Sequence, residues 1–258
     1  MLLVIDVGNT NIKLGLYDND SLRNSWRMSV KVTRTADEFA ITMESLFNTR
    51  NITFKDIDGI IMSSVSPDMN YTIEHACEYY IGLTPMVVGP GIKTGVNVQY
   101  TNPQELGADR IVNSVASYKL YGGPCIIVDF GTATTFNMIS IKGDFMGGVI
   151  APGIKSSVEA FTTNTAKLPT IELVKPAKII NKSTVGNMQA GIIYGFTGMV
   201  DYIIQKMKEE SGYENVKVIA TGGLSNLIAT EKDGIFDIID RFLTLKGLKI
   251  IYDMNKKE

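Results

Sequence analysis

An aspartate stands near the end of an apolar run in VIDVGNTNIK, residues 4–13. The run predicts a buried strand, and burying a carboxylate without a partner is costly. Asp6 is followed by Gly8, Asn9 and Thr10, residue types that favour a tight turn. Two interpretations follow: Asp6 caps its own turn through a backbone hydrogen bond, or it faces a bound cation.

A second copy of this pattern lies about half a chain further on, in CIIVDFGTATTFNMI, residues 125–139. In it, Asp129, Gly131 and Thr132 repeat the aspartate, glycine and threonine of the first copy. The distance between the copies is too long for a solenoid repeat and favours two domains of similar build. One copy alone would favour the capping interpretation, whereas two copies in register favour a ligand site.

The turns themselves suggest a phosphate ligand. Glycine lets the backbone approach a ligand closely, and successive backbone N–H groups form a concave donor cluster suited to phosphate oxygens. A carboxylate at the strand end, here Asp6, can hold hydrated Mg²⁺ against those phosphates. A third glycine turn, TGGLS at 221–225, would let a flat ring lie against the backbone, although strand-Gly-Gly-helix is also a common packing arrangement.

A helix is predicted to start at Asn102, with Glu105 completing a capping box. Asp109 and Arg110 then lie about two turns into the helix. Gly107, which costs ~1 kcal/mol inside a helix, leaves room for a ligand to approach. Asp109 is a candidate general base and Arg110 an anion clamp. The alternative is a solvated pair on an exposed helix face, which adds little stability, and the residues alone do not separate the two.

The composition argues against several classes of function. A net charge of -2 argues against a general nucleic-acid binder, and no window approaches the ~18 apolar residues that span a bilayer. His75 is the only histidine, which excludes a two-histidine metal motif, and its amphipathic segment predicts a structural or surface role. The two cysteines, Cys77 and Cys125, predict reduced structural thiols in a cytoplasmic protein. The first residues carry no basic leader, which predicts no signal peptide.

With these motifs assembled, the chain resembles the type III pantothenate kinases, a family within the superfamily of acetate kinase, sugar kinases, Hsp70 and actin. DVGNTNIKLGLY and DFGTATTF resemble the two phosphate motifs of the family, and TGGLS resembles its adenosine motif. GADR, residues 107–110, resembles its substrate and catalytic motif. VVGPGIKTG and FMGGVIAPGI are also typical, and the similarity covers nearly the whole chain in family order.

The resemblance implies a fold and a reaction. The fold is α/β, with two similar ribonuclease-H-like (actin-like) domains, expected at 1–120 and 121–258, and ATP bound in the cleft between them. The reaction transfers the γ-phosphate of ATP to the primary hydroxyl of pantothenate, giving 4′-phosphopantothenate in the first step of coenzyme A biosynthesis. The implied partners are ATP, pantothenate and a second copy in a homodimer, with no nucleic acid and no membrane.

The resemblance also assigns roles to residues. Asp109 is the base that accepts the hydroxyl proton, and Asp6 binds Mg²⁺, directly or through water. Asp129 holds a monovalent cation, K⁺ or NH₄⁺, which the residues alone do not separate from Mg²⁺. Thr184 matches a substrate-contacting threonine near the dimer interface, although Ser183 and Asn187 depart from the usual pattern, and the alternative role for Thr184 is an N-cap. The ATP-binding set is Asp6, Val7, Gly8, Asn9, Thr10, Asn11, Ile12, Lys13 and Thr132, and the substrate-binding set is Tyr100, Gly107, Ala108, Asp109, Arg110 and Thr184.

The hydrophobic pattern predicts a mixed α/β layout. Strands are predicted at 2–7, 12–17, 25–30, 59–65 and 85–89, before the second copy begins near residue 124. Helices are predicted at 36–49, opened by a capping box of Thr35 and Glu38, and at 68–81, 191–211 and 243–254. The last helix is expected either on the second sheet or returned to the first domain.

Three other functions stay open. Another small-molecule kinase of the superfamily would share the phosphate motifs, but GADR favours pantothenate as the substrate. A non-catalytic ATP-binding regulator of transcription would tolerate the loss of Asp6, Asp109 or Asp129, all of which are present. An actin-like filament former would need neither Asp109 nor Arg110, and assembly on adding ATP would reveal it.

Overall fold

The computed structural model describes residues 1–30, 32, 34–165 and 167–256, and the chain divides into two compact units. Unit 1 consists of Met1–Val96, Asn102–Ala116 and Leu243–Glu258, and unit 2 consists of Asn97–Thr101 and Ser117–Phe242. This division differs from the expected domains, 1–120 and 121–258. The last helix belongs with the first sheet, and the short segment before Asn102 belongs with the second.

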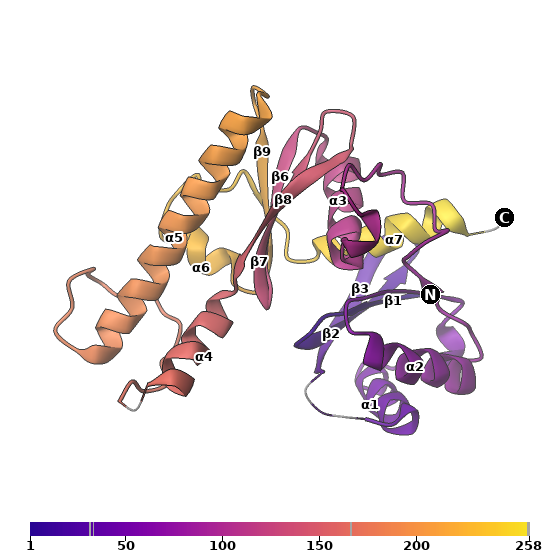
Figure 1. Cartoon of the computed structure of the whole chain (residues 1–258). Helices are drawn as coiled ribbons and strands as arrows, with labels where there is room; N and C mark the ends of the chain where they lie inside the picture. The colour runs from indigo at the N-terminus through magenta and orange to yellow at the C-terminus, as the bar shows by residue number, and fades with distance from the viewer. Residues whose placement is uncertain (31, 33, 166, 257–258) are drawn as a thin grey trace. The chain divides into compact units, whose positions relative to one another are not determined.

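Unit 1 is built on a five-stranded sheet of order β3-β2-β1-β4-β5 (Figure 1). The central strand β1 pairs antiparallel with β2 and parallel with β4. All six residues of β1 are buried, because helices cover the sheet on both faces. The strands are β1 (Leu2–Val7), β2 (Asn11–Asp18), β3 (Ser21–Ser29), β4 (Gly59–Ser64) and β5 (Met86–Val87).

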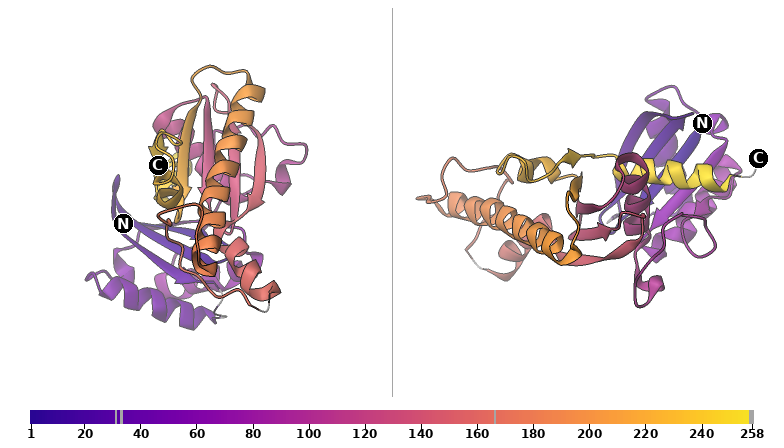
Figure 2. Two further views of the ribbon diagram at one scale, coloured as in Figure 1. Left: turned by 90° about the vertical axis from the view of Figure 1, so that its left-hand side faces the viewer. Right: turned by 90° about the horizontal axis from the view of Figure 1, so that it is seen from above.

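The two faces of this sheet carry separate apolar cores. Leu3, Ile5 and Val7 of β1 pack with α1 (Ala36–Asn48) and α2 (Pro67–Ala76). Leu2 and Val4 point the other way, since side chains alternate along a strand. They pack with α3 (Ala108–Tyr121) and α7 (Leu243–Asn255). Figure 2 shows α7, in yellow, along the strands of the first sheet.

Unit 2 repeats this topology with the order β10-β9-β6-β7-β8. Its central strand β6 pairs antiparallel with β7 and parallel with β9, as β1 does with β2 and β4. The duplicated strand and turn of the sequence are therefore the centres of two similar sheets, which confirms the predicted fold class. The strands are β6 (Cys125–Phe130), β7 (Ala133–Ile139), β8 (Phe145–Pro152), β9 (Lys217–Gly222) and β10 (Ile238–Ile239), and the helices are α4 (Ile154–Asn164), α5 (Thr184–Ser211) and α6 (Ser225–Ala229).

Most predicted elements of unit 1 are present, with shifts at their ends. The capping box at α1 is confirmed: Thr35 Oγ1 accepts from Glu38 N at 3.2 Å, and the Glu38 carboxylate accepts from Thr35 N at 2.9 Å. The helix predicted at 68–81 is α2 followed by a π-helical turn, η2 (Cys77–Ile81), which ends at Gly82 with φ 79°. None of the described helices combines the length and apolar character that a membrane span requires.

Candidate active site

Asp6 lies in a row of three polar side chains across the first sheet. The pairing register places Lys13 of β2 and Ser63 of β4 directly opposite Asp6, so the three side chains share one face. Lys13 Nζ lies 3.1 Å from Asp6 Oδ2, and Ser63 Oγ donates to Asp6 Oδ1 at 3.0 Å. Asp6 is 5% exposed. An ammonium group and a hydroxyl, rather than the backbone of its own turn, therefore offset the cost of burying this carboxylate.

The turn after β1 closes through a backbone hydrogen bond from Gly8 N to Asn11 O, at 3.0 Å. A Cβ at Gly8 would lie 3.2 Å from that oxygen, closer than ordinary contact, so the turn favours glycine there. Asn9 is exposed at the tip. The side chains of Val7 and Ile12 are fully buried in the core. Only the backbone groups of these two residues can therefore face a bound phosphate.

The helix predicted from Asn102 is split in two. Asn102 caps a short 3₁₀ turn, η3 (Pro103–Glu105), and its side chain accepts from Gln104 N at 3.3 Å. The α-helix α3 begins only at Ala108. Asp109 therefore lies in the first turn of α3, not two turns in. The positive end of the helix dipole there stabilises negative charge on Asp109 or on an anion bound beside it.

Gly107 precedes α3 and makes room for the side chain of Asp109. A Cβ at Gly107 would lie 2.6 Å from Asp109 Oδ1 and 3.5 Å from Val65 Cγ1. Asp109 Oδ1 also accepts from Arg110 N at 2.8 Å, which fixes the carboxyl group over the start of the helix. Arg110 is buried, so the alternative of a solvated pair on an exposed face is wrong.

The end of β4 links Asp6 to Asp109 within unit 1. Val65 N donates to Val7 O at 2.9 Å at the end of β1, and the side chain of Val65 borders Gly107. By alternation along β1, Asp6 faces the same side of the sheet as Leu2 and Val4, which is the side covered by α3. The structure thus brings Asp6 and Asp109 to one end and one face of the first sheet.

Asp129 occupies the corresponding row of the second sheet. Thr135 of β7 and Thr221 of β9 lie directly opposite it in the pairing register. Both neighbours offer hydroxyl oxygens, whereas Asp6 has an ammonium group on one side. Gly222 has φ 90°, and a Cβ there would lie 2.8 Å from Asp129 Oδ1 and 2.5 Å from Phe130 O. The backbone passes this close to the carboxylate only because residue 222 is glycine.

The turn of the second phosphate motif is held by the start of α4. Ser156 Oγ donates to Thr132 O at 2.9 Å. Gly153, the N-cap residue of α4, has no room for a side chain. A Cβ there would lie 2.1 Å from Thr132 O and 2.8 Å from Gly131 O. Thr132 itself is exposed, so backbone contacts fix its position and leave it at the surface.

The two remaining substrate residues lie in unit 2. Tyr100 belongs to this unit, whereas 107–110 belong to unit 1, and its ring packs edge-on against Phe145 at a centroid distance of 5.9 Å. Thr184 is the first residue of α5 and is exposed. The N-cap of α5 is Ser183, whose hydroxyl accepts a backbone N–H of the first turn at 3.1 Å. The N-cap alternative for Thr184 is therefore wrong.

Comparison with known proteins decides the family. A family model described as type III pantothenate kinase matches residues 2–206. The chain belongs to the type III pantothenate kinase family. It is 52% identical over 255 residues to the type III pantothenate kinase of Halalkalibacterium halodurans. This match covers 99% of the present chain and 100% of that protein. It is 53% identical over 255 residues to the type III pantothenate kinase of a Geobacillus species, strain WCH70. This match covers 99% of the present chain and 98% of that protein.

A solved structure extends the comparison to the fold. The inorganic polyphosphate/ATP-glucomannokinase of an Arthrobacter species, strain KM, matches with a TM-score of 0.51 at 16% identity, over 99% of each chain. At this identity the match shows a shared fold alone. It agrees with the pair of similar sheets, each with the same strand order, that units 1 and 2 contain.

Ser63 was missed by sequence reasoning, and its hydrogen bond to Asp6 leads to a testable expectation. We expect Ser63→Ala to lower kcat/KM for ATP about fivefold, because one hydrogen bond to a charged group is lost. Steady-state kinetics with ATP varied at saturating pantothenate would measure this. Ser63→Thr, which keeps the hydroxyl, serves as the matched variant and is expected to retain more activity. Equal kinetics for Ser63→Ala and the natural enzyme would contradict a role for this hydrogen bond.

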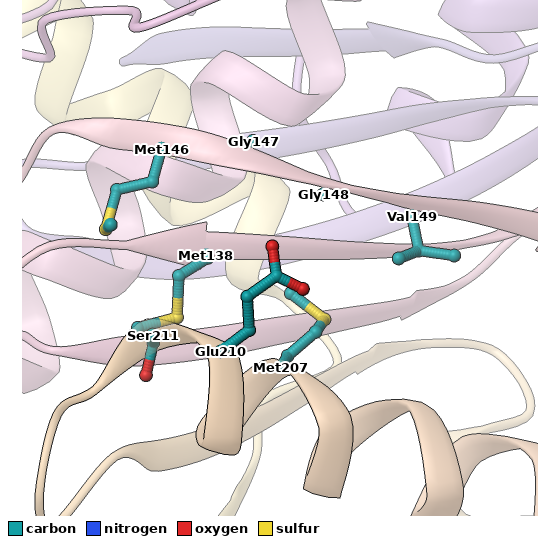
Figure 3. A pocket seen from close by; sticks show the side chains of 8 residues that line it. All are labelled: Met138, Met146, Gly147, Gly148, Val149, Met207, Glu210 and Ser211. Carbon is teal, nitrogen blue, oxygen red and sulfur yellow. The ribbon is translucent and has the colours of Figure 1, made fainter.

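Unit 2 contains a cavity whose lining includes none of the site residues assigned by family similarity. Its volume is about 290 Å³, and it lies between β7, β8 and the C-terminal end of α5 (Figure 3). It is lined by Met138, Met146, Gly147, Gly148, Val149, Met207, Glu210 and Ser211. None of the expected ATP, substrate or cation residues is among them.

The two cysteines are free and buried, as predicted for structural thiols. Burial raises the pKa of the Cys77 thiol to about 12 and that of Cys125 to about 12. Both thiols therefore stay protonated and unreactive at neutral pH. Within the described part of the chain, no three His, Cys, Asp or Glu side chains cluster as metal ligands. A cation site among these residues therefore has at most two such side chains as ligands.

Proposed function

We propose that Asp109 is the general base in a transfer of the γ-phosphate of ATP to the primary hydroxyl of pantothenate. The reaction is that of the family, an ATP-dependent kinase reaction that begins coenzyme A biosynthesis. The observation that carries the proposal is the placement of the Asp109 carboxyl group. Gly107 leaves space for it, Arg110 N fixes one oxygen, and the end of β4 joins it to the first phosphate motif.

In the proposed step, the hydroxyl oxygen of pantothenate attacks the γ-phosphorus and forms the new P–O bond. The bond from that phosphorus to the oxygen bridging the β- and γ-phosphates breaks, and ADP leaves with the electron pair. The hydroxyl proton passes to the Asp109 carboxylate, which raises the nucleophilicity of the attacking oxygen. In such reactions positioning and charge stabilisation contribute most of the rate enhancement.

The ATP phosphates are proposed to contact the turn formed by residues 6–13, with Thr132 as a further contact. Successive backbone N–H groups and short polar side chains suit phosphate oxygens. Lys13 supplies a positive charge at the end of this turn. Both oxygens of Asp6 already have protein partners, Ser63 and Lys13. We therefore place Asp6 near Mg²⁺ through water, where Mg²⁺ neutralises charge on the phosphates.

Pantothenate is proposed to contact Tyr100, Thr184 and residues 107–110. Its carboxylate requires a cation or N–H donors, and the buried guanidinium of Arg110 matches that requirement in charge. The exposed hydroxyl of Thr184, which takes no part in capping α5, suits a polar group of the substrate. The proposal includes a homodimer in the cytoplasm, as the family resemblance implies.

Asp129 is proposed to hold a monovalent cation, K⁺ or NH₄⁺. The two side chains directly opposite it are threonines, Thr135 and Thr221, so the row offers one carboxylate and two neutral hydroxyl oxygens. Such a donor set suits a large, weakly hydrated cation better than a divalent ion that needs more negative charge. Bound there, the cation would supply positive charge beside the second phosphate motif.

The test is ATP-dependent phosphorylation of pantothenate by the purified protein, with Mg²⁺ and either K⁺ or Na⁺. We expect product in K⁺ and little in Na⁺. Product in both salts would support the kinase and contradict the monovalent site at Asp129. The absence of product in either, with ATP binding intact, would contradict the proposed substrate and direct attention to other small-molecule acceptors.

A further inference from the structure

An aromatic row runs along the exposed side of α2 and η2. Tyr71 and His75 stack with nearly parallel rings at a centroid distance of 5.7 Å, and His75 stacks in turn with Tyr79 at 6.1 Å. Tyr80 meets Tyr79 edge-on at 5.0 Å. Tyr71 is 75% exposed and Tyr79 is 74% exposed. Side chains four residues apart share one side of a helix, so this row presents a continuous aromatic surface to solvent.

The two helices on this face of the first sheet, one of which carries the aromatic row, bear negative charges only. The two helical stretches on this face of unit 1, 36–48 and 67–81, contain six carboxylates and no lysine or arginine. Glu74 is three residues from Tyr71, and Glu78 is three residues from His75, so each lies beside the row. The six are Asp37, Glu38, Glu44, Asp68, Glu74 and Glu78.

The carboxylates are not neutralised within the described part of the chain. None of the six forms an ion pair with a described lysine, arginine or N-terminal amine. Asp37 accepts a hydrogen bond from the Tyr80 hydroxyl at 2.6 Å, and Glu78 accepts one from Thr84 at 3.0 Å. These contacts fix two carboxylates in place through neutral hydroxyl groups, without an ion pair.

The π-helical turn adds a second sign that this surface is specialised. In η2 the backbone winds one residue wider than an α-helix, a feature that recurs at functional sites. It lies where the row ends, at Tyr79 and Tyr80. The opposite side of α2 is ordinary core, with Met69 and Ile73 buried against the sheet. Core packing therefore explains one side of the helix and leaves the aromatic side unexplained.

We propose that this aromatic row, Tyr71, His75, Tyr79 and Tyr80, with its flanking carboxylates, is a docking surface for an arginine-rich segment of another protein. A guanidinium group stacks flat on a tyrosine ring and at the same time pairs with a carboxylate beside it. Alternating aromatic and acidic positions along one helix match successive arginines of an extended chain. Nucleic acid and anionic membrane surfaces carry the wrong charge for this face.

The only histidine of the chain makes a direct test possible. Because the sequence has one histidine, its imidazole ¹H resonances are expected to form a single set in an NMR spectrum, and His75 lies within the row. We expect a short peptide of alternating glycine and arginine, added at low ionic strength, to shift these resonances in a saturable way. A glycine–glutamine peptide of equal length is expected to cause no saturable shift. A glycine–lysine peptide is expected to bind more weakly, because an ammonium group does not stack as guanidinium does.

Variants separate this surface from general charge effects. Tyr71→Ser and Tyr79→Ser are expected to weaken binding roughly three- to fivefold each, in line with exposed cation–π contacts. Glu74→Gln and Glu78→Gln are expected to weaken it about two- to fivefold each, and added salt should do the same. The matched control is Tyr202→Ser, which removes a tyrosine that is 64% exposed on α5 and has Lys206 over its ring. It is expected to leave peptide binding unchanged.

Three results would overturn the proposal. One is a His75 response that is the same for the arginine and glutamine peptides. Another is equal weakening by Tyr202→Ser and Tyr71→Ser. The third is a His75 shift that grows with protein concentration in the absence of peptide and is lost in Tyr71→Ser. Such a result would show that the surface contacts a second copy of the chain instead.

Discussion

Replacing Asp109 with asparagine is expected to lower kcat by roughly 10²- to 10⁴-fold, the usual contribution of a general base. Asparagine keeps the size of the side chain and its acceptor oxygen for Arg110 N, so the start of α3 should be preserved. What it loses is the capacity to take the hydroxyl proton of pantothenate. ATP binding, measured by calorimetry, is expected to stay within about twofold, because the phosphate motif around Asp6 is untouched.

Asp233→Asn provides the matched control for this experiment. It makes the same chemical change at an exposed position of unit 2 that is outside the proposed site, and it is expected to leave kcat unchanged. Near-normal turnover in Asp109→Asn would contradict the assignment of the base. A loss of ATP affinity as large as the loss of kcat would instead indicate that Asp109 acts on nucleotide binding.

Replacing Gly153 with alanine is expected to lower kcat/KM for ATP about 100-fold. The new Cβ would lie 2.1 Å from Thr132 O and 2.8 Å from Gly131 O. All the crowded atoms belong to backbone, so no side chain can rotate away and the turn at Thr132 must move. A displacement of ~1 Å in a positioning group can cost about 100-fold in rate. The same overlap should also destabilise the fold by ~1–3 kcal/mol.

The second measurement for Gly153→Ala is thermal unfolding, which separates the two effects. The activity loss should persist at temperatures well below the transition of the variant. Gly191→Ala is the comparison: beyond the backbone of its own helix, this glycine of α5 has no neighbour within 4 Å of the added Cβ. There alanine should stabilise the protein by about 0.5–1 kcal/mol and leave kcat/KM unchanged. Full activity in Gly153→Ala would contradict a role for the Thr132 turn.

The duplicated architecture could be predicted from the sequence because its signals are local. Each copy places an aspartate, a glycine and a threonine after an apolar strand, and both copies proved to be central strands with the same neighbours. The capping box at Thr35 was equally readable, since its two residues lie three apart. Patterns of this kind depend on a few adjacent residues, so tertiary packing rarely overrides them.

Other features depended on pairing between distant segments. Ser63 looked like an ordinary polar residue late in a strand, and only the parallel register with β1 places its hydroxyl on Asp6. Thr221 faces Asp129 for the same reason. The break before α3 was also hidden, because Asn102 and Glu105 read as the start of one long helix. Gly107, which lies at this break, has space for only a hydrogen beside Asp109, and its neighbour Val65 is about 40 residues away in the sequence.

The return of α7 to the first sheet has a consequence for how the protein is made. Leu245, Leu248 and Ile251 complete the core that Leu2 and Val4 begin, so strand β1 depends on a helix that lies much later in the chain. Unit 2 is almost contiguous and has all its strands once Phe242 has been synthesised. During translation we therefore expect unit 2 to have all its segments available before unit 1 does. A chain that terminates just before Leu243 would contain both phosphate motifs and Asp109, yet one face of the first sheet would keep α3 and lack the cover that α7 provides.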